Sequence, residues 1–382
     1  MAKVLLVDTN FSSTPIHREL IALGHEVHVA GGNPNDCLAK FSPNYWSINY
    51  ADVPALQALV NKEKFDFVVP GCTDRSYESC TLLSGKKWPG VDSPQNSQIL
   101  SNKEHFKNWA QRAGLPVPQI QHPEAGGVRW PLIVKPVDAF SGKGITVVHS
   151  TKAGELDAAI VHAKQASPSG QYLIEDYVEG QLHSHTAFLR NHRVVQDFIV
   201  REDRTVNPYV VDTSRVEIDF PGAQWRQIRD CIETISRELG LVDGLLHTQF
   251  IKQGDRFWLI ELTRRCPGDL YSQLIELSTG FPYAQAYAMP FLSQPVLPKH
   301  KPVHQYVMRH TVSIGNETTF GHLKFRHPVW IERWITLSLA GDNLKPSPNS
   351  RVGILFCKAR DTSDLEHLYN ITLDRKLYDV VP

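Results

Sequence analysis

The sequence predicts an α/β unit at the start of the chain, followed by an α+β region whose strands pair as hairpins. Three observations lead to this prediction. Short β-branched runs alternate with amphipathic helical stretches over the first 70 residues. Segments 182–200 and 244–262 each hold two strand-like runs around a tight turn, and the region 303–382 is mixed but strand-rich. Strand–helix alternation is typical of a parallel sheet, and paired runs around turn residues are typical of antiparallel hairpins.

The first unit is predicted to alternate strands with helices, with strands at 3–7, 26–30 and 65–70 and helices at 16–24 and 54–62. Pro15 suits the opening of the first helix, and Gly24 suits its end. The turn after the first strand has no GxGxxG, so a dinucleotide site there lacks support.

The second region is predicted to hold helices at 101–114 and 221–240, a strand at 172–178, and the two hairpins, which turn at 190–192 and 254–255. Ser101 or Asn102 caps the first of these helices, and Gly114 ends it. The composition changes near Ser93 and again in the proline-rich stretch 290–302. We therefore predict three domains, with bounds 1–98, 99–300 and 301–382.

The charge balance and the cysteines limit the class of protein. Lysine plus arginine and aspartate plus glutamate both number 40, so the formal net charge is zero. Nucleic acids and anionic membranes call for a basic excess, so we expect neither as a main partner. No apolar run approaches the roughly 18 residues of a membrane span, and no signal peptide is evident. The six cysteines lack CxxC spacing, which favours reduced thiols in the cytoplasm.

Lys135 ends the apolar run LIV, and a glycine-containing loop, SGKG at 141–144, follows it. A lysine at a strand end can reach a phosphate, and glycines let backbone N–H groups approach the same oxygens. The loop is not a Walker motif, because GxxxxGK[ST] is absent. An exposed lysine before a hairpin turn explains the same residues equally well.

Glu175 ends the apolar strand of IEDYVEG, and Val178 lies in the connection after it. A nucleotide base needs an acceptor for its exocyclic amine and backbone groups for its ring edge, and a strand-to-loop transition offers both. Taken alone, the stretch is more simply an ordinary strand end with acidic residues in solvent.

The second hairpin carries oxygen-bearing side chains. Strand alternation is expected to place Phe257, Leu259, Glu261 and Thr263 on one face of its second strand and His247, Gln249 and Ile251 on one face of its first strand. If Lys252 pairs with Arg256, Gln249 and Glu261 are diagonal neighbours, and a two-residue register shift makes them directly opposite.

Such a pair suits Mg²⁺, which binds a few protein oxygens together with substrate phosphates. Glu261 would otherwise be a lone carboxylate in the apolar strand FWLIEL, which is costly. The structural alternative is an ion pair between Glu261 and Arg264 or Arg265, which follow it directly.

The order of these segments resembles the ATP-grasp superfamily over about residues 1–300. The closest similarity is to the carboxylate–amine ligases, including the L-amino-acid ligases, in which the last metal-binding strand runs into an arginine and a Pro-Gly, as IELTRRCPGD does here. The resemblance implies a Rossmann-like preATP-grasp domain, then an ATP-grasp fold, then a C-terminal α+β region that completes the active site.

The resemblance also implies roles for individual residues, with ATP and Mg²⁺, or alternatively Mn²⁺, as cofactors. Nucleotide binding is implied for Lys103, Lys135, Ser141, Gly142, Lys143, Gly144, Glu175, Tyr177, Val178 and Glu179. Metal binding is implied for Glu261, Gln249 and Thr263, and catalysis for Arg265 with Lys135. Further candidates for substrate contact are Arg264, Arg309 and Asp74.

Three positions depart from the family pattern. Gln249 stands where a metal-binding glutamate is usual, and Thr263 stands where asparagine is common. Leu182 stands near the usual place of a ribose-binding acid, so Glu179 or Gln181 would have to serve. His183 and His185 would suit zinc, but no matching Cys or His pair has the right spacing, so a pocket-lining or solvent-facing role is favoured.

The implied reaction is ATP-dependent ligation of a carboxylate to an amine through an acyl phosphate, which releases ADP and phosphate, with a dipeptide or amino-acid conjugate as one expected product. Two alternatives stay open: an ATP-grasp enzyme of carboxylase type or with a non-amine acceptor, and a non-catalytic nucleotide-binding module. Small-molecule substrates are expected as partners. A homodimer is expected from the resemblance alone.

Overall fold

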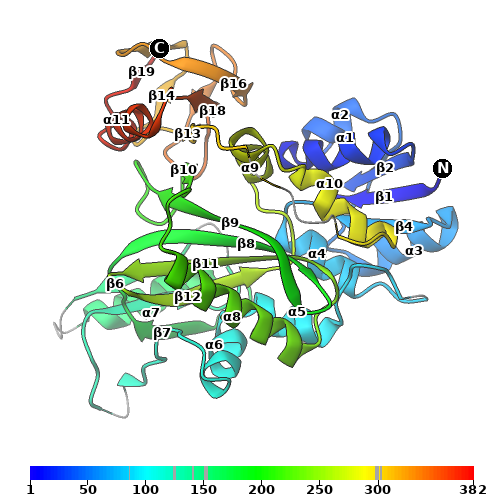
Figure 1. Ribbon diagram of the computed structural model, residues 1–382, viewed down its shortest axis with the longest axis horizontal. Coiled ribbons are helices and arrows are strands. Elements are labelled where there is room, and N and C mark those ends of the chain that lie inside the picture. The colour runs from blue at the N-terminus through cyan, green and yellow to red at the C-terminus, as the bar shows by residue number, and fades with distance from the viewer. Residues whose placement is uncertain (86, 124–125, 140–141, 150–153, 297–300, 302) are drawn as a thin grey trace.

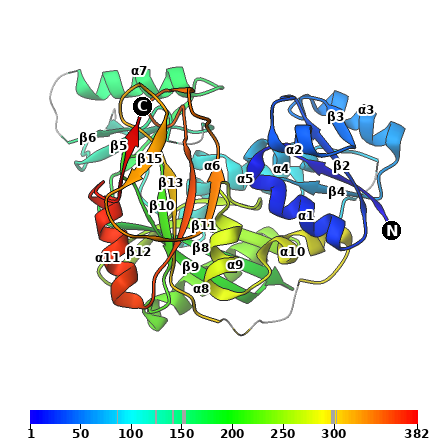
Figure 2. The same ribbon diagram turned by 90° about the horizontal axis from the view of Figure 1, so that it is seen from above.

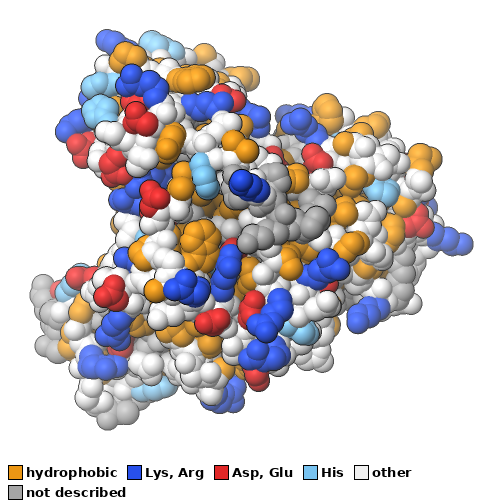
Figure 3. Space-filling model, in the orientation of Figure 1, with side chains coloured by type: hydrophobic (Ala, Val, Ile, Leu, Met, Phe, Trp, Pro, Cys, Tyr) orange, Lys and Arg blue, Asp and Glu red, His pale blue; other side chains and the backbone are white. Residues whose placement is uncertain are grey.

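The computed structural model describes residues 1–382 apart from 86, 124–125, 140–141, 150–153, 297–300 and 302. A parallel sheet forms the lobe at the right of Figure 1, C-terminal strands form the lobe at upper left, and a small sheet lies at lower left, with a large sheet between them. Figure 2 shows the same separation from above. The surface is hollowed between the two left-hand lobes, and acidic and basic side chains are interspersed over this face (Figure 3). Within the described residues, no helix combines the length and apolar character needed to cross a bilayer.

The N-terminal lobe is a parallel sheet in the order β3-β2-β1-β4. Its strands are β1 (Lys3–Val7), β2 (Glu26–Gly31), β3 (Tyr45–Ser47) and β4 (Phe67–Pro70). Its helices are η1 (Phe11–Ser13), α1 (Thr14–Ala22), α2 (Cys37–Phe41), α3 (Val53–Glu63) and α4 (Asp74–Thr81). The predicted strands and helices of this unit are confirmed. The sequence pattern does not reveal β3, which is three residues long and lacks a buried residue.

Two helices, α5 (Pro94–Ser101) and α6 (Lys103–Arg112), lead to a three-stranded antiparallel sheet. Its strands are β5 (Leu132–Pro136), β6 (Thr146–Val148) and β7 (Tyr172–Asp176), in the order β6-β5-β7, and α7 (Glu155–Ala166) packs on it. Asn102 caps α6, because its side chain accepts hydrogen bonds from the backbone N–H groups of Glu104 and His105. The cap fixes Lys103 in the first turn of α6.

The large sheet has eight strands in the order β12-β11-β8-β9-β10-β13-β18-β16. They are β8 (Gln181–Arg190), β9 (Arg193–Asp203), β10 (Thr213–Val216), β11 (Gly244–Gln253), β12 (Arg256–Thr263), β13 (Val307–Val312), β16 (Trp330–Thr336) and β18 (Gly353–Lys358). Helix α8 (Gly222–Leu239) packs against β8 and β9, and α9 (Tyr271–Thr279) packs against β10 and β13. Both predicted hairpins are confirmed, with turns at Asn191-His192 and Gly254-Asp255.

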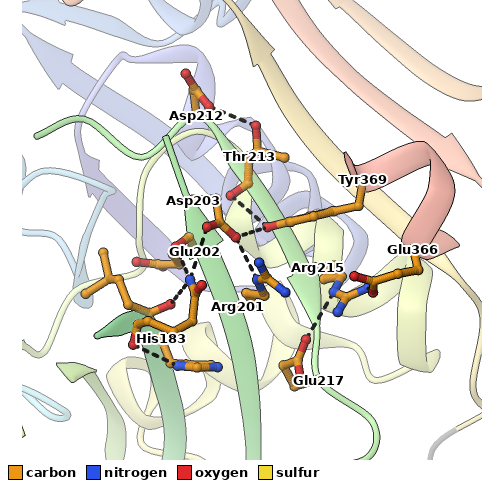
Figure 4. Close-up of polar contacts among 12 residues, drawn as sticks. His183, Arg201, Glu202, Asp203, Asp212, Thr213, Arg215, Glu217, Glu366 and Tyr369 are labelled. Carbon is orange, nitrogen blue, oxygen red and sulfur yellow. Dashed lines mark hydrogen bonds and ion pairs between the residues drawn. The ribbon is translucent and has the colours of Figure 1, made fainter. Parts of the chain in front are cut away.

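The C-terminal region extends the large sheet, because β13 pairs with β10. The paired strands β14 (Thr318–Thr319) and β17 (Asn343–Leu344), the paired strands β15 (His322–Phe325) and β19 (Tyr378–Val381), and helix α11 (Thr362–Leu373) complete it. Helix α11 is anchored by Tyr369, whose hydroxyl donates to Asp203 Oδ2 at 2.9 Å. The guanidinium groups of Arg201 and Arg215 lie 5.3 and 4.9 Å from the Tyr369 ring centre (Figure 4).

Helices α10 (Tyr283–Ala288) and η3 (Met289–Leu292) pack back on the N-terminal lobe. The Tyr287 hydroxyl donates to the Pro70 carbonyl at 3.1 Å, which ties α10 to the end of β4. Part of the predicted domain 99–300 therefore shares a hydrophobic core with the predicted domain 1–98. This packing joins the end of the parallel sheet to the segment that follows β12.

Candidate active site

Gln249 on β11 and Glu261 on β12 lie directly opposite each other. The Glu261 side chain is 47% exposed, so its carboxylate is accessible to a ligand. Lys103 Nζ lies 3.8 Å from Glu261 Oε2 and donates to the Ala139 carbonyl at 2.9 Å. The chain thus brings the first predicted nucleotide lysine to the predicted metal pair, although Lys103 is about 150 residues away in the sequence.

A β-bulge produces this alignment. The turn pairs Gln253 with Arg256, one residue from the expected pairing, and the extra residue Ile260 shifts the register by one more. The bulge also reverses the facing of the strand, so Leu259 points into the core while Glu261 faces the other side with Gln249. The prediction that Leu259 and Glu261 share a face is wrong, because simple alternation does not hold across a bulge.

Two lysines share the buried carboxylate of Glu175. Lys135 Nζ forms a short ion pair with one oxygen of Glu175, and Lys107 Nζ lies 3.7 Å from the other. Lys107 also donates to the Leu259 carbonyl at 2.9 Å. Burial alone would raise the pKa of Glu175, but the two lysines hold it below its ordinary value. Lys135 therefore lies at the end of an inner strand because a carboxylate on the neighbouring strand, β7, pairs with it.

Sequence reasoning missed Lys107. The signal was its position on α6, next to Phe106 and three residues before Ala110, both of which are buried in the core. A lysine beside an apolar stripe implies a buried partner. Burial lowers the pKa of Lys107 to about 7.

The low pKa of Lys107 predicts a pH-dependent stability. The folded protein releases this proton near pH 7, whereas the unfolded chain keeps it to about pH 10.4. Between these values the unfolded state binds more protons, so the free energy of unfolding rises with pH by up to about 1.4 kcal/mol per unit. In urea unfolding at pH 7, 8 and 9, the free energy of unfolding of the wild type should rise with pH relative to that of Lys107→Met. A constant difference between the two proteins would contradict the assignment.

The glycine loop after β5 is held in conformations that other residues avoid. Gly142 and Gly144 have φ of +70° and +72°. A Cβ on Gly142 would lie 2.6 Å from the backbone oxygen of Tyr209, in the loop after β9. Lys143 is exposed between them. Ser141 lies outside the described residues, and the role of this loop as a phosphate flap stays a prediction.

The connection from β7 to β8 holds the other predicted nucleotide contacts. The Tyr177 backbone N–H donates to the Pro131 carbonyl at 3.1 Å, which fixes the start of the connection. Val178 is half-buried and Glu179 is exposed. Because two lysines occupy the Glu175 carboxylate, the prediction of adenine contacts here rests on backbone groups of this connection.

Arg265 lies beyond the end of β12 and contacts the N-terminal lobe. Its Nε and Nη2 atoms donate to both oxygens of Asp74, at 2.9 and 2.7 Å. The Thr263 hydroxyl donates to the same carboxylate at 3.0 Å. Asp74 begins α4, four residues after the end of β4, at the edge where a parallel sheet presents ligand-facing residues. Burial alone would raise the pKa of Asp74, but Arg265 holds it below its ordinary value.

Arg264 does not face a substrate, which corrects the prediction for this residue. It is buried, and its guanidinium donates to Asp92 at 2.6 Å and to the carbonyls of Leu245 and Val242. Arg264 and Arg265 therefore have separate partners, and of the two it is Arg265 that pairs with Asp74 beside Thr263.

A buried polar network that sequence reasoning missed lies beside Gln249. The Gln249 amide donates to Glu202 Oε2 at 2.7 Å. Ser184 bonds to the Tyr271 hydroxyl at 2.8 Å, and Thr186 bonds to His247 Nδ1 at 2.9 Å. Burial raises the pKa of Glu202, and a cation nearby would favour its ionised form. In the sequence, VREDR resembles an ordinary charged strand end, which hides Glu202.

The loop after Arg265 is held by contacts to both the N-terminal lobe and the C-terminal region. The Asp269 backbone N–H donates to the Ser12 hydroxyl at 3.1 Å, its carbonyl accepts from Arg309 at 2.9 Å, and its carboxylate pairs with Arg351. Asp269 and Leu270 both have positive φ, 52° and 56°. Two such residues in succession are costly and cluster at functional sites. Arg309 is buried and supports this loop.

His183 and His185 face away from the site. His183 stacks on Phe250, and His185 Nε2 donates to the Asp197 carboxylate at 2.9 Å. Both side chains are buried on the α8 side of the sheet, so the pocket-lining and solvent-facing predictions are wrong. In the described part of the chain, no three His, Cys, Asp or Glu residues are grouped to hold a metal ion.

The donors at Gln249 and Glu261 nevertheless fit Mg²⁺. They are an amide and a carboxylate, the hard oxygen ligands that this ion prefers, and Mg²⁺ completes its shell with water and nucleotide phosphates. Glu261 is accessible, and the positively charged Lys103 lies beside it. The donor set therefore fits a cation held jointly by protein and nucleotide.

No protein-family model matches this sequence. One curated relative is the formate-dependent phosphoribosylglycinamide formyltransferase of Synechococcus sp. strain CC9311. It is 25% identical over 231 residues, which are 57% of this chain and 58% of the relative. The chain thus spans less than two thirds of that relative's length.

Solved structures resemble the chain over its whole length. Phosphoribosylglycinamide synthetase from Anaerococcus prevotii has a TM-score of 0.76 at 13% identity, covering 100% of this chain and 99% of that one. L-amino acid ligase from Bacillus licheniformis has a TM-score of 0.76 at 15% identity, covering 100% of this chain and 98% of that one. A third structure is the biotin carboxylase domain of Hydrogenobacter thermophilus 2-oxoglutarate carboxylase, solved with MgADP and bicarbonate. Its TM-score is 0.76 at 14% identity, covering 100% of this chain and 90% of that one.

These similarities confirm the predicted mixed α/β architecture, with an N-terminal parallel sheet, a small antiparallel sheet and a large sheet. The chain therefore has the same fold as these solved enzymes.

Proposed function

We propose that the chain is an ATP-dependent ligase that joins a carboxylate to an amine through an acyl phosphate and releases ADP and phosphate. One observation carries the proposal: Glu261 and Gln249 face each other, Lys103 lies beside Glu261, and Arg265, four residues beyond Glu261, pairs with Asp74. This arrangement supports a metal site at Glu261 and Gln249, between a lysine that would bind phosphate and an arginine that contacts the N-terminal lobe.

In the proposed reaction, Lys103 binds phosphate oxygens of ATP, and Glu261 with Gln249 holds Mg²⁺. The ion would neutralise charge on the transferred phosphoryl group. The donor carboxylate attacks the γ-phosphorus, the bond to ADP breaks, and an acyl phosphate forms. The amine then attacks the acyl carbon, phosphate leaves, and the amine loses a proton. Arg265, held rigid by Asp74, stabilises the phosphate and the tetrahedral oxyanion.

The substrates are proposed only as classes. The named activities of the similar proteins include use of formate and ligation of amino acids, which supports a small carboxylate as donor; a dipeptide or amino-acid conjugate is one product within this class. Asp74 acts through Arg265, and Arg309 acts through the loop at Asp269. A cytoplasmic location and a homodimer stay predictions.

The test is release of ADP from Mg-ATP with formate, amino acids and bicarbonate, each offered with and without an amine. Hydroxylamine is added to trap an acyl phosphate as a hydroxamate. Release that requires a carboxylate, with hydroxamate formed, supports the ligase. Release with bicarbonate alone favours a carboxylase. Binding of ATP without turnover on any donor favours the non-catalytic module. The glutamine at position 249, in place of the usual metal-binding glutamate, would then explain the lack of activity.

A further inference from the structure

Glu202 is a buried carboxylate that the proposed reaction leaves without a role. It lies on β9 and is 5% exposed. Alternation along β9 turns it to the side opposite Asp203, which contacts Tyr369 and Arg201 on the other face of the sheet (Figure 4). Glu202 therefore faces the side of the sheet that carries Gln249.

The contact with Glu202 orients the Gln249 amide. Gln249 lies opposite Ser184 on β8, and its side chain reaches across that strand to donate its NH₂ to Glu202 Oε2 at 2.7 Å. Within the described residues, the carbonyl oxygen of this amide has no hydrogen-bond partner. A carboxylate accepts hydrogen bonds only from the NH₂ end, so Glu202 selects the rotamer that leaves the oxygen free.

Glu202 also supplies charge. An amide at position 249 leaves Glu261 as the one carboxylate of the directly opposed β11–β12 pair. Glu202 is joined to that pair by a single hydrogen bond, and its charge is close enough to Glu261 for the two to interact. The neighbouring basic group is Arg309, which interacts with Glu202 while donating to Ser214 and Asp269. The acidic group is thus in place before a cation arrives.

We propose that Glu202 is a positioning residue of the cation site: it turns the Gln249 carbonyl toward the ion and supplies, from β9, the negative charge that β11 lacks. The inference rests on the proposed function in taking the ion to be the Mg²⁺ that accompanies the nucleotide. Outer groups that orient metal ligands commonly change metal affinity by 10–100-fold when removed.

The test measures binding of Mn²⁺ to the full chain with ADP present, from the free-ion signal in electron paramagnetic resonance. Glu202→Gln should weaken Mn²⁺ binding by about 10–100-fold. The exchange variant Glu202→Gln with Gln249→Glu, which moves the carboxylate to the neighbouring partner and keeps the hydrogen bond, should bind within a few-fold of wild type. A purely structural residue would not be rescued in this way.

Asp203→Asn is the matched control, because it removes the same charge one residue along β9 but on the opposite face. It should loosen the Tyr369 contact and lower the unfolding midpoint while Mn²⁺ affinity stays unchanged. Equal Mn²⁺ affinity in wild type and Glu202→Gln would overturn the inference and leave the ligase intact. A raised KM for the amine with unchanged Mn²⁺ affinity would also overturn it, since Glu202 would then contact substrate. Absence of Mn²⁺–ADP binding in wild type would overturn the proposed function itself.

Discussion

Glu261→Gln is expected to reduce carboxylate-dependent ADP release by about 10²–10³-fold or more, because it removes the single carboxylate of the opposed strand pair. Glutamine keeps the size of the side chain and the oxygen but loses the charge that holds the cation against the phosphates. Nucleotide binding should survive in weakened form, since Lys103 and the connection after β7 remain.

A coupled assay of ADP formation, together with calorimetric titration of ADP, separates turnover from binding. Asp255→Asn is the matched control: it removes a carboxylate from the exposed turn of the same hairpin and should leave both quantities unchanged. Full turnover by Glu261→Gln would contradict the assignment of Glu261 to the metal site.

Glu175→Gln is expected to destabilise the protein by about 3–5 kcal/mol, because it leaves Lys107 and Lys135 buried without a counter-charge. The two lysine side chains are 0% and 4% exposed, so water cannot replace the lost partner. The midpoint of urea unfolding at pH 6 measures the effect, since Lys107 is charged below its pKa of about 7.

The neighbouring carboxylate provides the control for that experiment. Asp176 pairs with the largely exposed Arg129, so Asp176→Asn should cost less than about 1 kcal/mol. Adding Lys107→Met to Glu175→Gln should restore part of the lost stability by removing one of the two stranded charges. If Glu175→Gln lowers the free energy of unfolding no more than Asp176→Asn does, the two lysines must find other partners.

Much of the fold could be predicted because its signals are local. Strand–helix alternation, the turn residues at Gly254-Asp255 and the cap at Asn102 each depend on a few neighbouring residues, and the structure confirms all three. The pairing of Asp74 with Arg265 could be anticipated only as a position at the end of a parallel strand, because its partner is 191 residues away.

The parts that escaped prediction depend on geometry between segments. The bulge at Ile260 reverses the facing of Glu261, and no residue in FWLIEL marks it. The roles of Lys107 and Glu202 depend on partners that lie on other elements, Glu175 and Gln249 respectively. Local sequence patterns set the facing of a side chain within its own element, but not which distant group it meets.

The strand order of the large sheet also constrains how the chain folds as it is synthesised. The ladder runs from β10 directly to β13, so the inner strand β10 has an open edge until residues 307–312 emerge from the ribosome. During the roughly 90 residues of synthesis between them, the exposed N–H and C=O groups of β10 can pair with another nascent chain. Helix α11, which anchors this part of the sheet through Tyr369, is synthesised later still. A chaperone that binds the nascent chain would therefore protect it most during that interval, before β13 pairs with β10.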